Sequence, residues 1–225
     1  MEYELVARIR TDFPSKFGIP RQSGMVEGLR GRIVFEPAYR NAEALRGLEG
    51  FSHLWIIWDF SEAHRQGWSP TVRPPRLGGN QRVGVWATRS PFRPNPIGLS
   101  SVRIEAIYLN TPEGPVIEVE GADLMDGTPI LDMKPYLPYT DSHPDAKGGF
   151  AQAQHSEEEM LTVEITPEMA DRLPKEKMEA LRQVLAADPR PRYQDNPERI
   201  YGFAFADREI HFRVKEGTLT VTSIS

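Results

Sequence analysis

The stretch VGVWATRSPFRPNPIGLSSVRI, from Val83 to Ile104, is the most informative part of this chain. Its two ends, Val83–Thr88 and Leu99–Ile104, are rich in β-branched and apolar residues and predict two strands. The polar loop between them contains three prolines, at positions 91, 94 and 96. Each proline fixes its own φ angle and disfavours the helical region for the residue before it. The loop is therefore either a stiff connector between strands or a rigid part of a binding site.

Short strands are also predicted on both sides of this stretch, at Tyr3–Ile9, Gly31–Phe35, Phe51–Phe60, Val102–Leu109 and Val116–Glu120. The turn residues of Asn110–Pro115 indicate a hairpin between the last two of them. Apolar residues at helical spacing predict a short helix over Tyr39–Leu48. Several short strands separated by turn signals are typical of a barrel or a sandwich, so the first part of the chain is predicted to be all-β.

The end of the chain has a different pattern. Thr166 followed by Pro167 is typical of a helix start, and a second helical segment is predicted over Lys175–Ala187. Three more runs predict a meander of strands, at Ile200–Phe205, Glu209–Val214 and Thr218–Ile224. We therefore expect a β domain over residues 1–145 and a small C-terminal α+β domain over residues 146–225, joined by the polar segment Leu137–Glu159.

Composition excludes several kinds of site. The chain has 225 residues, a net charge of −5 and no cysteine, so disulfides, thiol catalysis and cysteine-bound metals are excluded. No apolar run reaches the length of a transmembrane helix, and the N-terminus MEYELVARIR lacks the apolar core of an export signal. The histidines show no metal-ligand spacing. We therefore expect a cytoplasmic protein with no membrane partner and no metal.

Positive charge is concentrated in one segment. Between Ala63 and Ile104 there are seven arginines and no acidic residue. Guanidinium groups bind phosphate through two hydrogen bonds, so this segment is suited to nucleic acid, although a solvated basic face is an equally good interpretation of charge alone. The long loop Ser61–Arg82 within it is a candidate substrate-facing lid.

Motifs of common cofactor and catalytic sites are missing from the sequence. There is no GxGxxG, no GxxxxGK[ST] and no GxSxG. Five other segments, in order along the chain, resemble the TsaA-like family, whose bacterial members are tRNA methyltransferases of the TrmO type. They are PRQ at 20–22, RGLEGFSHLWII at 46–57, RPPRLGG at 73–79, ATRSPFRPNPIGLS at 87–100 and DLMDGTPILDMKPYLP at 123–138. The segment DPRPRY at 188–193 is also similar to the bacterial form.

The resemblance implies a fold, a cofactor and a reaction. The family's catalytic domain is an antiparallel β-barrel that binds S-adenosylmethionine (SAM) without a Rossmann sheet. The implied reaction is N6-methylation of threonylcarbamoyladenosine at position 37 of tRNA, next to the anticodon, by a homodimer. The alternatives are a non-catalytic RNA-binding barrel and a SAM-dependent methyltransferase that acts on another substrate. The role of the C-terminal domain is open between tRNA contact and support of the dimer.

The resemblance also implies a cofactor site. The matching positions are Pro20, Arg21, Gln22, Ser61, Glu62, Arg89, Leu99, Glu120, Gly121, Ala122 and Asp123. Relatives carry histidine where this chain has Ser61, so a contact could be lost there, or His64 could replace it. Arg21 or Arg89 is suited to the carboxylate of the cofactor, and Asp123 or Glu120 to its amino group or ribose.

Chemistry predicts the remaining site residues. We expect the phosphates of the anticodon stem-loop to be bound by Arg73, Arg76 and Arg82. Arg93 is assigned to the threonyl carboxylate or a phosphate, and Asn95 to the RNA or the modified base. The acceptor nitrogen must lose a proton, and Asp123 and Tyr136 are the predicted catalytic groups. Asp126 is a third possible proton acceptor, although its position favours a simple turn residue.

Overall fold

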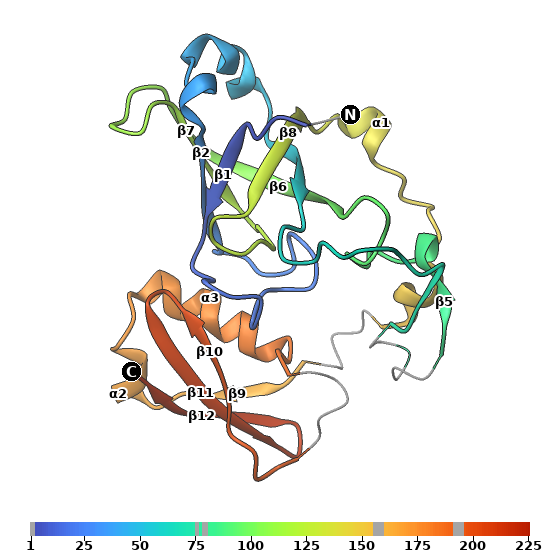
Figure 1. Cartoon of the computed structure of the whole chain (residues 1–225). Helices are drawn as coiled ribbons and strands as arrows, with labels where there is room; N and C mark the ends of the chain where they lie inside the picture. Colours follow the sequence, from blue (N-terminus) through green and yellow to red (C-terminus); the bar gives the residue numbers. More distant parts are fainter. Residues whose placement is uncertain (1–2, 75–76, 78–80, 155–159, 191–195) are drawn as a thin grey trace.

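Six antiparallel strands close into a barrel, in the order β1-β2-β7-β6-β3-β8 (Figure 1). The computed structural model describes residues 3–74, 77, 81–154, 160–190 and 196–225. The barrel strands are β1 (Ala7–Arg10), β2 (Arg30–Phe35), β3 (His53–Asp59), β6 (Ile97–Tyr108), β7 (Val116–Glu120) and β8 (Pro129–Pro135). The predicted hairpin is confirmed, since β6 pairs with β7 on either side of the turn. The mainly β prediction and the antiparallel barrel are confirmed.

Alternation of buried and partly exposed residues explains why these segments form a barrel. In β3 the side chains of Leu54, Ile56 and Trp58 are buried, and those between them are not. They share one apolar core with Ile33 of β2 and Ile117 of β7, two strands that do not pair with β3. Burial of an apolar side chain of this size contributes about 1.5–3 kcal/mol to folding. A strand with apolar residues at every second position is therefore stable only with that face turned toward the core.

Two local predictions are wrong. The helix predicted over Tyr39–Leu48 is replaced by three 3₁₀ turns, Pro37–Tyr39, Ala42–Leu45 and Leu48–Gly50, with Gly47 between the last two at a φ of 87°. The strand predicted over Val83–Thr88 ends after β5 (Val83–Gly84), which pairs only with β4 (Thr71–Val72). A 3₁₀ turn, Val85–Ala87, follows, and the hydroxyl of Thr88 closes it by donating to the carbonyl oxygen of Val85 (2.8 Å).

The C-terminal part forms a second sheet, in the order β10-β11-β12-β9. The predicted meander is confirmed by β10 (Tyr201–Phe205), β11 (Arg208–Lys215) and β12 (Thr218–Ile224). The sequence did not indicate β9 (Thr162–Glu164), which pairs in parallel with β12. The helices are α1 (Pro138–Asp141), α2 (Pro167–Ala170) and α3 (Lys175–Ala186), with a 3₁₀ turn at Gly149–Gln154. No described helix is long and apolar enough to cross a membrane.

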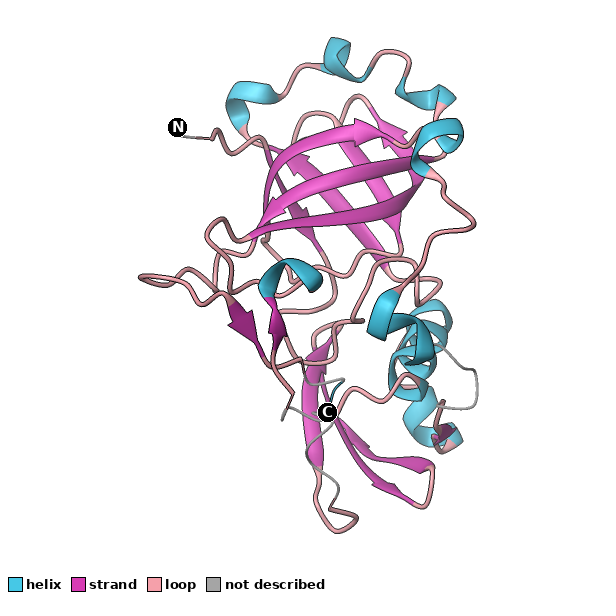
Figure 2. Cartoon of the chain, turned by 90° about the vertical axis from the view of Figure 1, so that its right-hand side faces the viewer, coloured by secondary structure: helices cyan, strands magenta, loops and turns pink. Residues whose placement is uncertain are grey.

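The connection between β1 and β2 joins the barrel to the C-terminal part. Figure 2 shows the barrel and the C-terminal sheet at opposite ends of the molecule, with loops between them. Phe13 lies in the core of the C-terminal sheet, with its ring centroid 5.2 Å from that of Phe205. Lys177 of α3 forms an ion pair with Asp12, and the side-chain oxygen of Gln183 accepts from the backbone N–H of Glu27 (2.9 Å). The C-terminal part therefore holds this connection in place.

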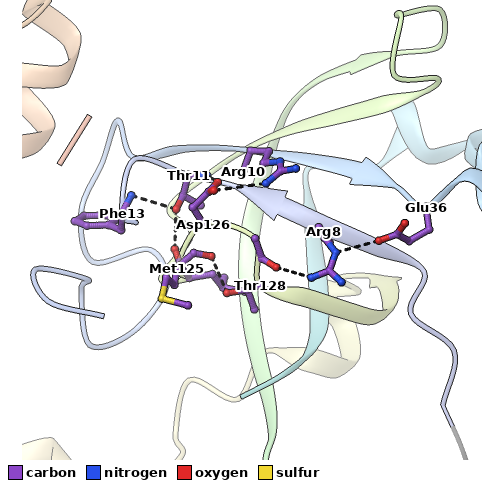
Figure 3. Close-up of polar contacts among 10 residues, drawn as sticks. Arg8, Arg10, Thr11, Phe13, Glu36, Met125, Asp126 and Thr128 are labelled. Atoms are coloured by element: carbon purple, nitrogen blue, oxygen red, sulfur yellow. Dashed lines mark hydrogen bonds and ion pairs between the residues drawn. The ribbon is translucent and has the colours of Figure 1, made fainter. Parts of the chain in front are cut away.

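Asp126 stabilises a turn (Figure 3). Its carboxylate accepts from the backbone N–H of Thr11 (3.0 Å) and lies 3.5 Å from a guanidinium nitrogen of Arg10. In the same network Thr128 donates to the carbonyl oxygen of Met125 (2.7 Å). Since these contacts tie the turn before β8 to β1, the structure supports a turn role for Asp126 and gives no support to proton transfer.

Candidate functional site

A cavity of about 810 Å³ opens at one end of the barrel. Its walls come from the β1–β2 connection, the end of β3, the loop before β6, the start of β6 and the segment before β8. Ten of the residues predicted for binding or catalysis line it: Pro20, Arg21, Gln22, Ser61, Glu62, Arg89, Arg93, Asn95, Leu99 and Asp123. The structure thus brings together residues that are widely separated in the sequence.

Asp123 is held by a chain of hydrogen bonds from the adjacent strands β3 and β6. The indole N–H of Trp58 donates to the hydroxyl oxygen of Ser100 (3.0 Å), and that hydroxyl donates to Oδ1 of Asp123 (2.6 Å). Trp58 lies against Gly98, the residue opposite it on β6, where an added Cβ would come within 2.1 Å of the ring. Gly98 therefore leaves the space that the indole needs to reach Ser100.

The environment of Asp123 makes it a stronger base than an exposed aspartate. Burial raises its pKa, because desolvation penalises the charged carboxylate. The hydrogen bond from Ser100, backbone amides and the positive charge of Arg89 act in the opposite direction without cancelling the effect of burial. A carboxyl group with a raised pKa, in a cavity, is a typical proton acceptor at a functional site.

Arg89 provides positive charge on the same cavity wall. Its guanidinium donates to the side-chain oxygen of Gln22, which lies 67 positions earlier in the sequence. The Gln22 amide in turn donates to the carbonyl oxygen of Arg21. The hydrogen bond between Arg89 and Gln22 links the proline-rich loop of residues 89–96 to the β1–β2 connection. The rigid loop is therefore part of a cavity wall as well as a connector.

Three predicted cofactor residues have structural roles beside the cavity. Glu120 accepts from the backbone N–H of Gly28 (2.7 Å) and forms an ion pair with Arg103. Gly121, at a φ of 81°, exchanges backbone hydrogen bonds with the β1–β2 connection, donating to Leu29 and accepting from Gly24. Ala122 is buried. The segment 120–122 does not line the cavity and instead holds the β1–β2 connection against the barrel.

Tyr136 lies away from the cavity. Its backbone N–H donates to the carbonyl oxygen of His53 (3.0 Å), at the start of β3, whereas the cavity lies at the other end of that strand. Its ring packs 5.6 Å from the ring of Trp55. The cavity lies at the start of β8, whereas Tyr136 follows its last residue. Tyr136 and Asp123 are therefore at opposite ends of the barrel, and we assign Tyr136 no part in catalysis.

The arginines predicted to bind phosphates lie outside the cavity lining. Arg73, which is exposed, directly follows β4, and Arg82 directly precedes β5. Arg82 also donates to the hydroxyl of Thr71 in β4 (2.8 Å). Both arginines therefore belong to the β4–β5 hairpin. Arg76 lies outside the described residues. The 3₁₀ turn that follows β5 carries Trp86, which does line the cavity. Neither Arg73 nor Arg82 is therefore placed to contact a small ligand inside the cavity.

Ser61 is an exposed residue of the cavity wall. His64 does not line the cavity, but its Nε2 lies 2.8 Å from Oδ1 of Asp59, which does. His64 thus contacts a wall residue and does not itself reach the cavity.

Several lining residues were missed by the sequence analysis. Trp58 and Phe60 were assigned only to a buried strand, yet both line the cavity, with ring centroids 4.1 Å apart. Trp86 and Phe92 also line it. For Trp86 and Phe92 a signal was available in the sequence, because they are large aromatic residues within a polar, arginine-rich segment, where folding does not require them. Among the described residues, no group of three or more acidic or histidine side chains is placed to hold a metal ion.

Comparison with known proteins adds to this geometry. Residues 8–142 match the family model of the tRNA-methyltransferase O N-terminal domain, and residues 158–225 match that of the TrmO C-terminal domain. A tRNA (adenine(37)-N6)-methyltransferase of Escherichia coli is 41% identical over 99% of this chain and 97% of its own length. A putative S-adenosylmethionine-dependent methyltransferase of Pseudomonas aeruginosa is 41% identical over 92% and 90%. A crystal structure of TrmO from P. aeruginosa has a TM-score of 0.78 and 32% identity, and the match covers 100% of this chain and 98% of that one.

Proposed function

Because this chain belongs to the TrmO family of tRNA methyltransferases, we propose that its barrel cavity is where a methyl group passes from SAM to tRNA. The enzyme is a SAM-dependent tRNA methyltransferase that acts on N6 of adenosine 37. We propose in addition that its substrate is the threonylcarbamoyl form of that adenosine, presented in the anticodon stem-loop. The observation that carries the site assignment is that Asp123 and Arg89 share one cavity with a fixed hydrogen-bond network.

The residues present fit the cofactor. A cavity of about 810 Å³ is within the range of about 300–1,000 Å³ that is typical of small-molecule sites. It offers a guanidinium for a carboxylate, a carboxylate for an amino group or hydroxyl, and the aromatic rings of Trp58 and Phe60 for a cation. Leu99, more than half exposed although apolar, adds a surface that a base can cover. SAM has a carboxylate, an amino group, hydroxyls, a sulfonium cation and a base.

The reaction requires positioning and a proton acceptor. SAM supplies the methyl group on a positively charged sulfur. The N6 atom of the modified adenosine is a weak nucleophile, because the adjacent carbonyl withdraws its lone pair, and it must lose its proton. We assign that proton to Asp123, whose raised pKa suits it as a base, and we assign the Trp58–Ser100 hydrogen bonds to orientation of its carboxylate. Arg89, fixed by Gln22, binds the carboxylate of the cofactor.

Arg93 is suited to the threonyl carboxylate of the substrate. Its Nη1 donates to the carbonyl oxygens of Thr88 (3.1 Å) and Ser90 (3.2 Å), so the proline-rich loop holds the guanidinium at the cavity wall. The other N–H groups of a guanidinium are arranged for a carboxylate. Asn95, on the same wall, is available for the modified base. Phosphates of the stem-loop are assigned to the hairpin arginines Arg73 and Arg82.

Three further proposals follow from the family. We propose that the enzyme is a homodimer, which light scattering will test, and that it acts in the cytoplasm, where its tRNA is found. We also propose the domain division at residues 1–145 and 146–225, which is supported by the two separate apolar cores of the barrel and the C-terminal sheet.

The site is tested by calorimetric titration of the protein with SAM. We expect Arg89→Ala to weaken SAM binding by about 10-fold or more, since a hydrogen bond to a charged group is worth about 1.5–3 kcal/mol. Arg208→Ala removes an exposed arginine from the C-terminal sheet and serves as the matched control, with unchanged affinity expected. Equal SAM affinity in wild type and Arg89→Ala would remove Arg89 from the cofactor site.

A further inference from the structure

Three large aromatic side chains are exposed at the cavity or next to a residue that lines it. Trp68, Trp86 and Phe92 are 51%, 66% and 40% exposed. The rings of Trp68 and Trp86 lie 5.8 Å apart between centroids, at an angle of 38°. Trp86 and Phe92 line the cavity, so this aromatic surface continues outward from the place where the methyl group is transferred. Exposed side chains of this size do nothing for the core and point to a binding surface.

Two arginines accompany these rings. The guanidinium carbon of Arg65 lies 3.7 Å from the ring centroid of Phe92, and that of Arg93 lies 5.3 Å from the ring centroid of Trp86. Both arginines also line the cavity. Flat rings in a positively charged surface are typical of proteins that bind single-stranded nucleic acid, because bases stack on the rings and the charge attracts the polyanionic backbone.

A second copy of the chain is a less suitable occupant than RNA. The sequence from 63 to 104, which contains the aromatic surface, carries seven arginines and no acidic residue. In a two-fold symmetric interface the same surface appears on both partners, so Arg65 and Arg93 of one copy would add to the positive charge of the other. A nucleic acid brings a negative charge with every nucleotide and complements this surface.

We propose that Trp68, Trp86 and Phe92 form a stacking platform for unpaired bases of the anticodon loop that flank the reacting adenosine. This inference rests on the proposed function, since it presumes that the cavity receives a base from an RNA loop. A base can enter a cavity only after it has left the stack of its neighbours, and aromatic side chains compensate those neighbours for the stacking they lose. The platform is thus a specificity element for a loop as opposed to a duplex.

Trp68 is the best position for a test, because it belongs to the aromatic surface but does not line the cavity. We expect Trp68→Leu to weaken binding of an anticodon stem-loop hairpin by about 5- to 150-fold, the range typical of one base stacked on one aromatic ring. Trp68→Phe keeps a ring and is expected to retain most of the affinity. Tyr139→Leu, at an 86% exposed tyrosine in α1, is the matched control and is expected to bind as wild type.

Abasic RNA identifies stacking directly. Hairpins that lack one base at a time around the target adenosine keep every phosphate, so they lose stacking but not charge. We expect one such hairpin to bind wild type more weakly, and to bind Trp68→Leu no more weakly than the intact hairpin does. The salt dependence of binding should be the same in wild type and Trp68→Leu, because no ionic contact is removed.

The outcomes separate this inference from the function on which it rests. Wild-type affinity and turnover in Trp68→Leu and Trp86→Leu, together with methyl transfer by wild type, would overturn the platform and leave the function intact. Loss of the dimer in Trp68→Leu, measured by light scattering, would also overturn it, since the ring would then contact a second copy. A wild-type enzyme that transfers no methyl group to any tRNA would contradict the proposed function itself.

Discussion

Replacement of Gly98 by alanine tests the hydrogen-bond chain that holds Asp123. An ideal Cβ at this position comes within 2.1 Å of Cε2 of Trp58, and two more ring carbons lie within 2.5 Å of it. Carbon atoms that are not bonded prefer about 3.5–4.0 Å, so the indole must move by more than an ångström. The indole N–H is 3.0 Å from the hydroxyl oxygen of Ser100, and a displacement of that size breaks the bond.

The expected cost has two parts. Inserting a methyl group into a packed barrel costs about 1–3 kcal/mol. The lost hydrogen bond between Trp58 and Ser100 adds about 1 kcal/mol. We therefore expect Gly98→Ala to lower the free energy of unfolding by about 2–4 kcal/mol. Because Ser100 then no longer has a fixed orientation toward Asp123, kcat/KM for methyl transfer should fall by about 10-fold or more, the effect of one weakened bond to a charged group.

The assays are urea unfolding and methyl transfer from labelled SAM to tRNA. Gly50→Ala is the matched control, since an added Cβ there meets nothing within 4 Å, and its stability should stay within about 0.5 kcal/mol of wild type. If Gly98→Ala were as stable and as active as wild type, the indole would not be held by Gly98 and the account of how Asp123 is positioned would be wrong.

Three further predictions concern other parts of the site. Asp123→Asn should abolish transfer. Burial raises the pKa of Asp123 above its ordinary value of 3.8, so folding favours the protonated form, and the contribution of Asp123 to the free energy of unfolding falls as pH rises above that value. The stability of Asp123→Asn relative to wild type should therefore rise with pH over the same range, as urea titrations at several pH values will show. Phe203→Leu should weaken SAM binding in calorimetry, since the Phe203 ring packs against Gly18, just before the cavity-lining residues 19–22; unchanged affinity would separate the C-terminal sheet from the cofactor site. Arg73→Glu should weaken tRNA binding and reduce its salt dependence, and an unchanged slope would exclude a phosphate contact at Arg73.

The barrel could be predicted in part because its signals are local. The aromatic and β-branched residues of Phe51–Phe60 and the turn residues between β6 and β7 predict a strand and a hairpin without reference to distant residues. The turn at Asp126 could also be predicted from local residue types, although its contacts with Arg10 and Thr11 could not. The strand predicted over Val83–Thr88 failed because β-branched residues favour a strand only where a partner strand is available, and β4 offers two residues.

Contacts between distant segments could not be predicted from patterns. Nothing local indicates that Gln22 meets Arg89, and only the family resemblance united them. The position of Tyr136 shows the same limit, since alternation along β8 does not tell which end of the barrel carries the cavity. Phe13 looks like an ordinary apolar loop residue, and its place in the C-terminal core depends on a sheet nearly 200 residues later in the chain.

The central claim is tested most directly by one transfer experiment. Purified protein is incubated with SAM labelled in the methyl group and with tRNA that carries threonylcarbamoyladenosine, the same tRNA without the modification, and a tRNA with guanosine at position 37. Wild type is expected to label only the first, on N6 of that adenosine, and Asp123→Asn is expected to label none of them. Label on the guanosine-containing tRNA, or full activity in Asp123→Asn, would contradict the account.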